Sequence, residues 1–243
     1  MEMSKKEKIF RNIVCNLVVC CLVFTVLFAC IIAGKEKVET VATNKEYNGT
    51  IYAGDKSTNT VSLMINVYWG NEHLERILSI FENNGINSTF FIGGSWALEN
   101  QELLKKIKDL GHEIASHGFS HKEHGKLDYN NNLIEIQKCH NIVKDILGVD
   151  MELFAPPGGS YNKQTIKAAE DLGYKTIMWT RDTIDWRDKD ADLIYKRAVN
   201  GLSGGDLILM HPTNETVVAI EKFIELAKSK NLKISTVSQT LGL

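Results

Sequence analysis

Two histidines spaced four residues apart are the side chains of this sequence best suited to chemistry. His117 and His121 follow an apolar pair, Ile114 and Ala115. On a helical turn, positions i and i+4 share one face, so two imidazoles there lie close enough to bind one metal ion. The spacing therefore predicts a metal-binding turn and raises the question of which other residues complete the site.

Composition limits the partners of the chain. The 243 residues include 28 basic and 30 acidic side chains, so there is no basic surplus to hold a phosphate backbone. This balance argues against a nucleic-acid partner. Four of the five cysteines lie between positions 15 and 30, and only Cys139 lies beyond them. One thiol cannot build a disulfide framework or a cysteine metal site, so we expect Cys139 to pack as a small apolar residue.

The N-terminal 34 residues have the pattern of a membrane anchor. Basic residues are concentrated in positions 1–12, and positions 13–34 then run without a charged side chain. At about 1.5 Å per residue, this run spans the roughly 30 Å of a bilayer core. Because the basic flank lies upstream, we predict a cytoplasmic N-terminus (1–12), a transmembrane anchor (13–34) and an extracytoplasmic remainder. A cleaved signal peptide or a lipid on Cys30 stays open as an alternative.

The elements that must position the histidines begin at Val61. Positions 35–60 are polar and indicate a linker, whereas 61–243 alternate apolar bursts with amphipathic segments. About seven β-then-α units predict an α/β fold with a parallel sheet, in the form of a deformed or incomplete (β/α) barrel of about seven strands. The expected strands are 61–67, 88–92, 113–115, 151–154, 176–179, 206–210 and 232–236. The expected helices are 72–84, 100–110, 131–147, 162–172, 190–200 and 215–229.

Five of the expected strand ends carry residues that could do chemistry. In parallel α/β folds, the functional groups lie in the loops that follow the strands. Here those loops contain positions 66–70, the histidine pair, positions 154–162, positions 182–186 and His211. Each has a structural explanation when taken alone, such as a turn cap for Asp182. Their occurrence at successive strand ends favours one shared site.

In this order the loops resemble the motifs of the NodB-homology polysaccharide deacetylases, carbohydrate esterase family 4, over residues 61–243. The matching residues are Phe91, the His-x-x-x-His pair, the Pro-Pro loop ending in Tyr161 and Asn162, the Asp-x-x-Asp-Trp run at 182–186, and the Leu-Met-His run at 209–211. The resemblance implies a barrel that binds Zn²⁺ or a similar divalent ion and removes N-acetyl groups. We therefore expect a membrane-anchored, extracytoplasmic hydrolase that acts on peptidoglycan or a related amino-sugar polymer.

The resemblance also assigns roles to individual residues. It makes His117 and His121 the metal ligands. His211 becomes the general acid, and Asp185 orients it. The further substrate contacts that it implies are Pro156, Gly158 at the place of an oxyanion-hole N–H, Tyr161 in the same loop, and Trp186 and Leu209, which would line the acetyl pocket.

The first motif departs from the family pattern. Where the family has Thr-Phe-Asp-Asp-Gly, positions 66–70 read Asn-Val-Tyr-Trp-Gly. Tyr68 stands for the base aspartate, Trp69 for the metal-binding aspartate, and Ala155 for the arginine that steadies the base. General-base catalysis is usually worth about 10²–10⁴-fold in rate, and two imidazoles alone make an incomplete zinc site. Three losses at one place indicate one altered site.

Two hypotheses follow from this departure. In the first, the chain is a metal-dependent deacetylase whose third ligand comes from elsewhere. Glu72 is the preferred candidate, with Glu123 and His124 as further ones that are equally explained as solvated helix or loop residues. In the second, the chain is an inactive glycan-binding or scaffold protein that keeps the groove, where Tyr68 and Trp69 stack on sugar rings. Metal content and acetate release discriminate between the two.

Overall fold

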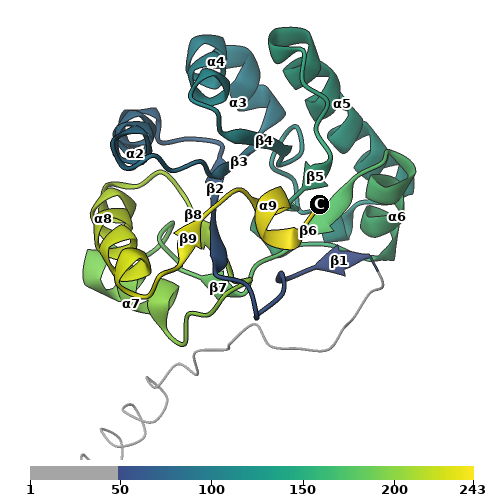
Figure 1. Ribbon diagram of the computed structural model, residues 1–243. Helices are drawn as coiled ribbons and strands as arrows, with labels where there is room; N and C mark the ends of the chain where they lie inside the picture. The colour runs from purple at the N-terminus through teal and green to yellow at the C-terminus, as the bar shows by residue number, and fades with distance from the viewer. Residues whose placement is uncertain (1–48) are drawn as a thin grey trace, which may run out of the picture. The chain divides into compact units, whose positions relative to one another are not determined.

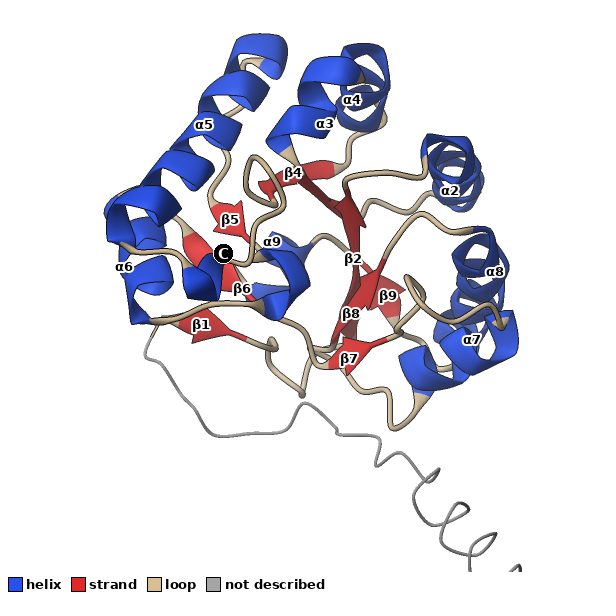
Figure 2. Cartoon of the chain, turned by 180° about the vertical axis from the view of Figure 1, so that it is seen from behind, coloured by secondary structure: helices blue, strands red, loops and turns tan. Residues whose placement is uncertain are grey.

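The computed structural model describes residues 49–243. The predicted cytoplasmic segment 1–12, the predicted anchor 13–34 and the predicted linker up to residue 48 lie outside the described residues. Between residues 49 and 243, no helix combines the length and the apolar character needed to cross a bilayer. Figure 1 and Figure 2 show a curled sheet with helices packed around its outside.

The strands form one parallel sheet around the long central strand β2. Along the sheet the order is β1-β6-β5-β4-β3-β2-β8-β7, and β9 pairs with the start of β2. Within the described chain, the end strands β1 and β7 do not pair with each other, so the sheet curls without closing. This confirms the predicted α/β fold with an incomplete barrel. The strands are β1 (Thr50–Ile51), β2 (Thr60–Val67), β3 (Thr89–Ile92), β4 (Glu113–Ser116), β5 (Leu153–Phe154), β6 (Lys175–Ile177), β7 (Arg181–Asp182), β8 (Leu207–Met210) and β9 (Lys233–Ile234).

Helices follow most strands and cover the outer face of the sheet. Their starts are set by polar caps. The Asn162 side chain, for example, accepts hydrogen bonds from the backbone N–H groups of Gln164 and Thr165 at the start of α6. The helices are α2 (Asn71–Asn84), α3 (Gly94–Glu99), α4 (Gln101–Asp109), α5 (Tyr129–Leu147), α6 (Lys163–Asp171), α7 (Ala191–Val199), α8 (Asn214–Ser229) and α9 (Val237–Leu241), with the 3₁₀ turns η1 (His124–Lys126) and η2 (Pro157–Gly159).

The alternation of side chains along β2 separates two apolar cores. Leu63, Ile65 and Val67 belong to the outer core, which packs against the helices. Met64 belongs to the inner core, which fills the barrel together with Leu209 and other strand residues. Because successive strand residues point to opposite faces, β2 is buried on both sides and reads as a nearly continuous apolar run.

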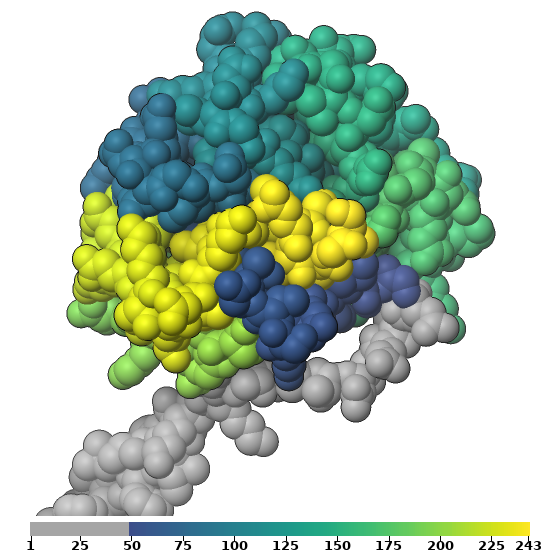
Figure 3. Space-filling view, in the orientation of Figure 1, coloured from purple at the N-terminus to yellow at the C-terminus, as the bar shows by residue number. Residues whose placement is uncertain are grey.

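Several element predictions are wrong in detail. β1 pairs with β6, so Thr50 and Ile51 belong to the sheet, although positions 35–60 were expected to be a linker. A strand of two residues leaves no readable alternation in the sequence. The expected strand 232–236 is reduced to β9, and α9 follows it. The backbone of α9 lies against Gly54, and Figure 3 shows the C-terminal residues packed beside the first described ones.

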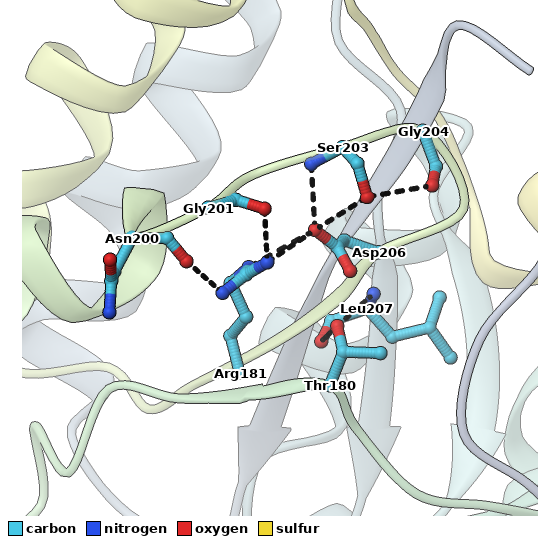
Figure 4. Close-up of polar contacts among 8 residues, drawn as sticks. All are labelled: Thr180, Arg181, Asn200, Gly201, Ser203, Gly204, Asp206 and Leu207. Carbon is cyan, nitrogen blue, oxygen red and sulfur yellow. Dashed lines mark hydrogen bonds and ion pairs between the residues drawn. The ribbon is translucent and has the colours of Figure 1, made fainter. Parts of the chain in front are cut away.

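The edge strand β7 is held by an ion pair that its neighbour supplies. The Arg181 guanidinium donates to the buried Asp206 carboxylate at 2.9 and 3.1 Å, and also to the carbonyl oxygens of Asn200 and Gly201 (Figure 4). The backbone N–H of Ser203 donates to the same carboxylate oxygen. These contacts fix the edge strand to the loop before β8, and so they fix the start of the segment that contains Asp182 and Asp185.

Candidate functional site

Asp185 and His211 form the best-connected part of the site. Asp185 is fully buried. Its Oδ1 accepts a hydrogen bond from His211 Nδ1 at 2.8 Å, and its Oδ2 accepts one from the His211 backbone N–H at 2.6 Å. The Thr216 hydroxyl also donates to Oδ2, at 2.6 Å. Because a carboxylate can only accept, His211 Nδ1 carries a proton, and Nε2 is the nitrogen available to a ligand.

A tight turn after β7 places Asp185 under His211. Ile184 has a backbone φ of 54°, an uncommon value for a β-branched residue. Its N–H donates to the Asp182 carboxylate at 2.9 Å, which stabilises the turn. Burial raises the pKa of Asp182, although this hydrogen bond and the nearby His211 oppose the shift. Asp182 therefore caps the turn, as its structural explanation predicts, and also lies near the imidazole.

The two histidines of the pair lie together, but not on a helical turn as predicted. His117 follows β4 directly, and His121 lies in the loop before η1 with a φ of 54°. The glycine at 118, with a φ of 73°, turns the chain between them, so the i,i+4 helical geometry does not arise. The ring centroids are nevertheless 5.2 Å apart. The two imidazoles are therefore brought together by a loop that folds back on itself, and not by a helix.

His117 is a neutral, buried imidazole. It is 1% exposed, and Nδ1 donates to the Ala155 carbonyl oxygen at 2.8 Å, which leaves Nε2 with the lone pair. Burial and the neighbouring His121 hold the pKa of His117 well below its usual range, against the opposing effect of the Ala155 carbonyl. Partial desolvation also lowers the pKa of His121, with a contribution from His211. Both imidazoles are thus available as neutral ligands or hydrogen-bond partners.

Tyr68 and Trp69 place aromatic rings directly beside the histidines. The Tyr68 ring lies 5.0 Å from the His121 ring, and its hydroxyl accepts a hydrogen bond from the Ser95 hydroxyl at 2.6 Å. The Trp69 indole lies parallel to the His211 imidazole, with ring centroids 6.0 Å apart and an angle of 5° between the planes. Trp69 remains 42% exposed. The two rings therefore line the opening of the site on its β2 side.

Comparison with known proteins identifies the family. The family model for polysaccharide deacetylases matches residues 53–177. The chain belongs to the polysaccharide deacetylase family. The match confirms the family predicted from the strand-end loops, although it begins before Val61, in agreement with the position of β1 in the sheet.

Similar proteins in this family include one without a stated activity and one that is named as a deacetylase. The chain is 36% identical over 191 residues to the uncharacterized protein YlxY of Bacillus subtilis, covering 79% of this chain and 60% of YlxY. It is 29% identical over 167 residues to the peptidoglycan-N-acetylglucosamine deacetylase PgdA of Listeria monocytogenes, covering 68% of this chain and 35% of PgdA. The chain thus spans less than two thirds of the length of these relatives.

A solved structure of similar fold is a CE4 family pseudoenzyme from Bacillus anthracis. It has a TM-score of 0.77 and 34% sequence identity, and the match covers 79% of this chain and 68% of that one. A mutant of that pseudoenzyme, described as having restored enzymatic activity, matches with the same TM-score and 33% identity over 79% of this chain and 71% of that one. The proteins similar to this chain therefore include some that are named as deacetylases and one that is named as a pseudoenzyme.

The residues around the pair do not fit the family's catalytic metal. Such an ion takes three protein ligands. Among residues 49–243, no group of three His, Cys, Asp or Glu side chains lies close enough to hold one. Glu72 does not supply the missing carboxylate: it lies at the start of α2, it is 73% exposed, and its carboxylate lies 3.4 Å from the neighbouring His73. The preference for Glu72 is therefore wrong, because its helix turns it toward α3 and α4.

Among the described residues, the other two candidate ligands do not complete a group of three with the pair either. Glu123 forms an exposed ion pair with Lys126 at 2.8 Å. His124 is fully buried, and its Nδ1 lies 2.7 Å from the Asn132 side-chain oxygen. Its other nitrogen lies under Gly118, where a Cβ atom would come within 2.7 Å of it. His124 therefore supports the loop from below.

The remaining predicted substrate contacts differ widely in exposure. Trp186 is 54% exposed and follows Asp185 directly, while Leu209 is buried in the inner core. Pro156 is buried, whereas Gly158 is exposed and adopts a φ of 59°. The Tyr161 hydroxyl lies 2.7 Å from the Tyr52 hydroxyl. The roles of these residues in substrate binding stay predictions.

Sequence reasoning missed Thr216 and Glu135, which both support the site. Thr216 is 31 residues from Asp185 and reads as part of an ordinary helix cap, since its N–H donates to the Thr213 hydroxyl. Nothing local marks its second contact. Glu135 left a readable signal, because it lies on the buried face of α5 with Ile136 and Cys139. A carboxylate on such a face needs a partner.

Proposed function

We propose that this chain is an extracytoplasmic cell-wall protein that binds N-acetylated glycan through a deacetylase groove without hydrolysing it. The observation that carries the proposal is the position of Tyr68 and Trp69. Their rings lie against His121 and His211, at the place where the family pattern has its two aspartates. The named pseudoenzyme among the similar structures supports this reading, and the named peptidoglycan deacetylases support peptidoglycan as the polymer.

The chemistry of hydrolysis lacks two of its groups. An amide carbonyl must be polarised, and a water molecule must lose a proton to a base. Asp185 is fully buried and accepts hydrogen bonds from His211 and Thr216, so a water molecule does not reach it to give up this proton. A phenol, as at Tyr68, has no carboxylate oxygen to take the proton and is a poor substitute for an aspartate base. The donor set for a catalytic metal is incomplete as well.

The same residues are suited to binding a sugar. Trp69 and Trp186 are the two exposed tryptophans of the described chain, at 42% and 54% exposure. One stacks on His211, and the other follows the carboxylate that holds His211. Exposed indole faces present large, rigid apolar surfaces, and the His211 imidazole on which Trp69 stacks offers a hydrogen-bonding nitrogen. This combination suits the apolar face and the polar edge of a sugar ring.

Anchoring belongs to the same proposal. The uncharged run at 13–34, after a basic segment, would hold the domain at the outer surface of the membrane, within reach of the cell wall. The polar residues that follow would separate the domain from the bilayer. A membrane-held domain that binds glycan would connect the wall to the membrane without altering the polymer.

A slow deacetylase is the second candidate function, and one observation favours it. The pair of Asp185 and His211, which the family resemblance names as the general acid and its orienting carboxylate, keeps a complete set of hydrogen bonds. Loss of the base alone would leave about 10⁻²–10⁻⁴ of the rate. Such an activity would still need a bound metal. The missing ligands of that metal would have to come from residues outside 49–243 or from the substrate.

The deciding experiment measures binding and acetate release on the same sample. The full-length chain is incubated with purified peptidoglycan, sedimented, and assayed for bound protein, released acetate and metal content. Saturable co-sedimentation without acetate release is the expected result. Stoichiometric metal with steady acetate release, abolished in His211→Ala, would replace the first candidate with the second. Failure to sediment with peptidoglycan or with chitin would remove the glycan-binding proposal.

A further inference from the structure

One face of helix α5 holds the loop that carries His121. Asn132 at the start of this face donates from its side chain to the carbonyl oxygens of His124, Leu127 and Asp128. Lys138, further along the helix, places its ammonium 3.6 Å from the centre of the Phe119 ring. Positions three apart lie on the same side of a helix, so 132, 135 and 138 form one continuous stripe. The loop rests along this stripe from residue 119 to residue 128.

Glu135 is the centre of this stripe, and its carboxylate is almost completely buried. The residue is 4% exposed, yet three donors from the loop satisfy it. The Ser120 backbone N–H donates to Oε2 at 2.7 Å, and the Ser120 hydroxyl donates to Oε1 at 3.1 Å. The Lys122 ammonium lies 2.7 Å from Oε1. Burial opposes ionisation, but the hydrogen bonds from Lys122 and Ser120 outweigh it, and the pKa of Glu135 lies below its usual range.

The three contacts fall on the two sequence neighbours of His121. His121 has a φ of 54°, a left-handed conformation that non-glycine residues adopt only when the surroundings enforce it. With Ser120 fixed on one side and Lys122 on the other, the backbone of His121 has little freedom to relax. The same restraint keeps its ring 5.2 Å from His117 and 5.0 Å from Tyr68.

We propose that Glu135 is the positioning residue of the site, which sets the place of the His121 imidazole by binding the residues on both sides of it. The proposal rests on the proposed function, because it makes glycan binding depend on a carboxylate that never touches the glycan. It also accounts for a charged side chain on the buried face of α5, where an apolar residue would pack more simply. The Glu135 carboxylate at this position holds the loop through Ser120 and Lys122.

The test is a double-mutant cycle on affinity for chitin oligosaccharide, using the full-length chain. Glu135→Gln keeps the shape but turns an amide N–H₂ toward the loop donors. We expect about tenfold weaker binding in the native background and less than a twofold change in a His121→Ala background, since coupled residues are not additive. Glu102→Gln is the matched control, because Glu102 is an exposed glutamate that pairs with Lys105 on α4. It should change neither affinity.

Each other outcome decides the matter. Equal losses in both backgrounds, or no loss in either, would overturn the positioning role. If Glu135→Gln does not fold, Lys122→Met replaces it in the same cycle, because the Lys122 side chain is 52% exposed and its removal spares the core. If the native chain binds no glycan, the proposed function fails, and a crystal structure of the variant then decides the inference alone. A displaced His121 ring supports it, and an unmoved ring overturns it.

Discussion

The two halves of the site differ in how completely their polar groups are paired. On one side, Asp185 accepts three hydrogen bonds and holds His211 in a single orientation. On the other side, His117 and His121 face each other without a carboxylate, and Tyr68 lies against them. The first half is complete as a structural unit without any ligand. The second half is complete only if an ion or another ligand joins it.

This difference indicates why one half departs from the family pattern and the other does not. Removing Asp185 would leave buried donors of the chain itself without partners, which costs stability in the folded protein. Removing carboxylates whose work is to bind an ion and a water molecule leaves no buried group unsatisfied. The aromatic rings at 68 and 69 then add packing against glycine 93 and His211. Stability therefore preserves one half of the site, and only function would preserve the other.

The sharpest test of this contrast is the stability of Asp185→Asn. The amide keeps the shape but turns a donor toward His211 or Thr216, and it removes a buried charge from three hydrogen bonds. We expect a loss of about 3 kcal/mol in the free energy of unfolding, the range for breaking a buried charged network. Urea denaturation followed by circular dichroism measures it. Asp192→Asn, on an exposed helix start, is the control and should change little. Equal effects of the two would erase the contrast.

The converse test restores a carboxylate to the half of the site that contains His117 and His121, which we call the depleted half. By the family resemblance, Trp69→Asp supplies the missing metal ligand, and Tyr68→Asp supplies only the base. We expect Trp69→Asp to tighten Zn²⁺ binding by about a hundredfold or more, since even outer-shell partners are worth 10–100-fold. Isothermal titration with elemental analysis checks this. Tyr68→Asp alone is the matched control and should gain much less. Gains of equal size would show that the two positions do not divide the roles as the family pattern does.

A smaller effect is expected when the exposed aromatic surface is reduced. Trp69→Ala removes the indole that stacks on His211, and we expect about tenfold weaker binding of chitin oligosaccharide, a usual loss for an aromatic anchor. Ile134→Ala is the matched control, because Ile134 is 57% exposed on α5. Fluorescence titration or calorimetry gives both affinities. If Ile134→Ala weakens binding as much, the binding surface does not lie at the opening of the barrel.

The sequence predicted the fold and the neighbourhood of the site from signals that are local. The apolar run of β2 and the amphipathic period of α2 and α5 depend on residues close in sequence, and both are present in the structure. The short strands β1 and β7 were missed because two residues give no period. The ends of parallel strands meet at one edge, which is why loops far apart in sequence could be assigned to one site.

The internal geometry of the site was less accessible from the sequence. The i,i+4 spacing of the histidine pair predicted a helical turn, but Gly118 and the left-handed His121 fold the loop back instead. Glu72 was preferred as a ligand because it follows Gly70 closely, whereas the direction of α2 turns it away from the pair. Both errors concern where a side chain points, which depends on packing between elements and not on spacing along the chain.

Two buried histidines make the chain sensitive to acid: His117 in the depleted half of the site, and His112, which packs against Phe81 and Phe90. Burial lowers the pKa of His112 to about 4, and burial, together with the neighbouring His121, holds the pKa of His117 well below its usual range. Below a pH of about 6.5, these histidines therefore bind protons in the unfolded chain but stay neutral in the folded chain. The free energy of unfolding then falls as the pH falls. His112 contributes about 1 kcal/mol between pH 7 and about 5.5, and His117 contributes in the same direction.

Urea unfolding at several pH values measures this slope. His117→Asn keeps a donor for the Ala155 carbonyl and removes the titrating group, so we expect it to flatten the slope. An unchanged slope in the variant would mean that His117 is protonated in the folded chain as readily as in the unfolded one. In that case the imidazole is hydrated in solution, which contradicts a buried, neutral His117.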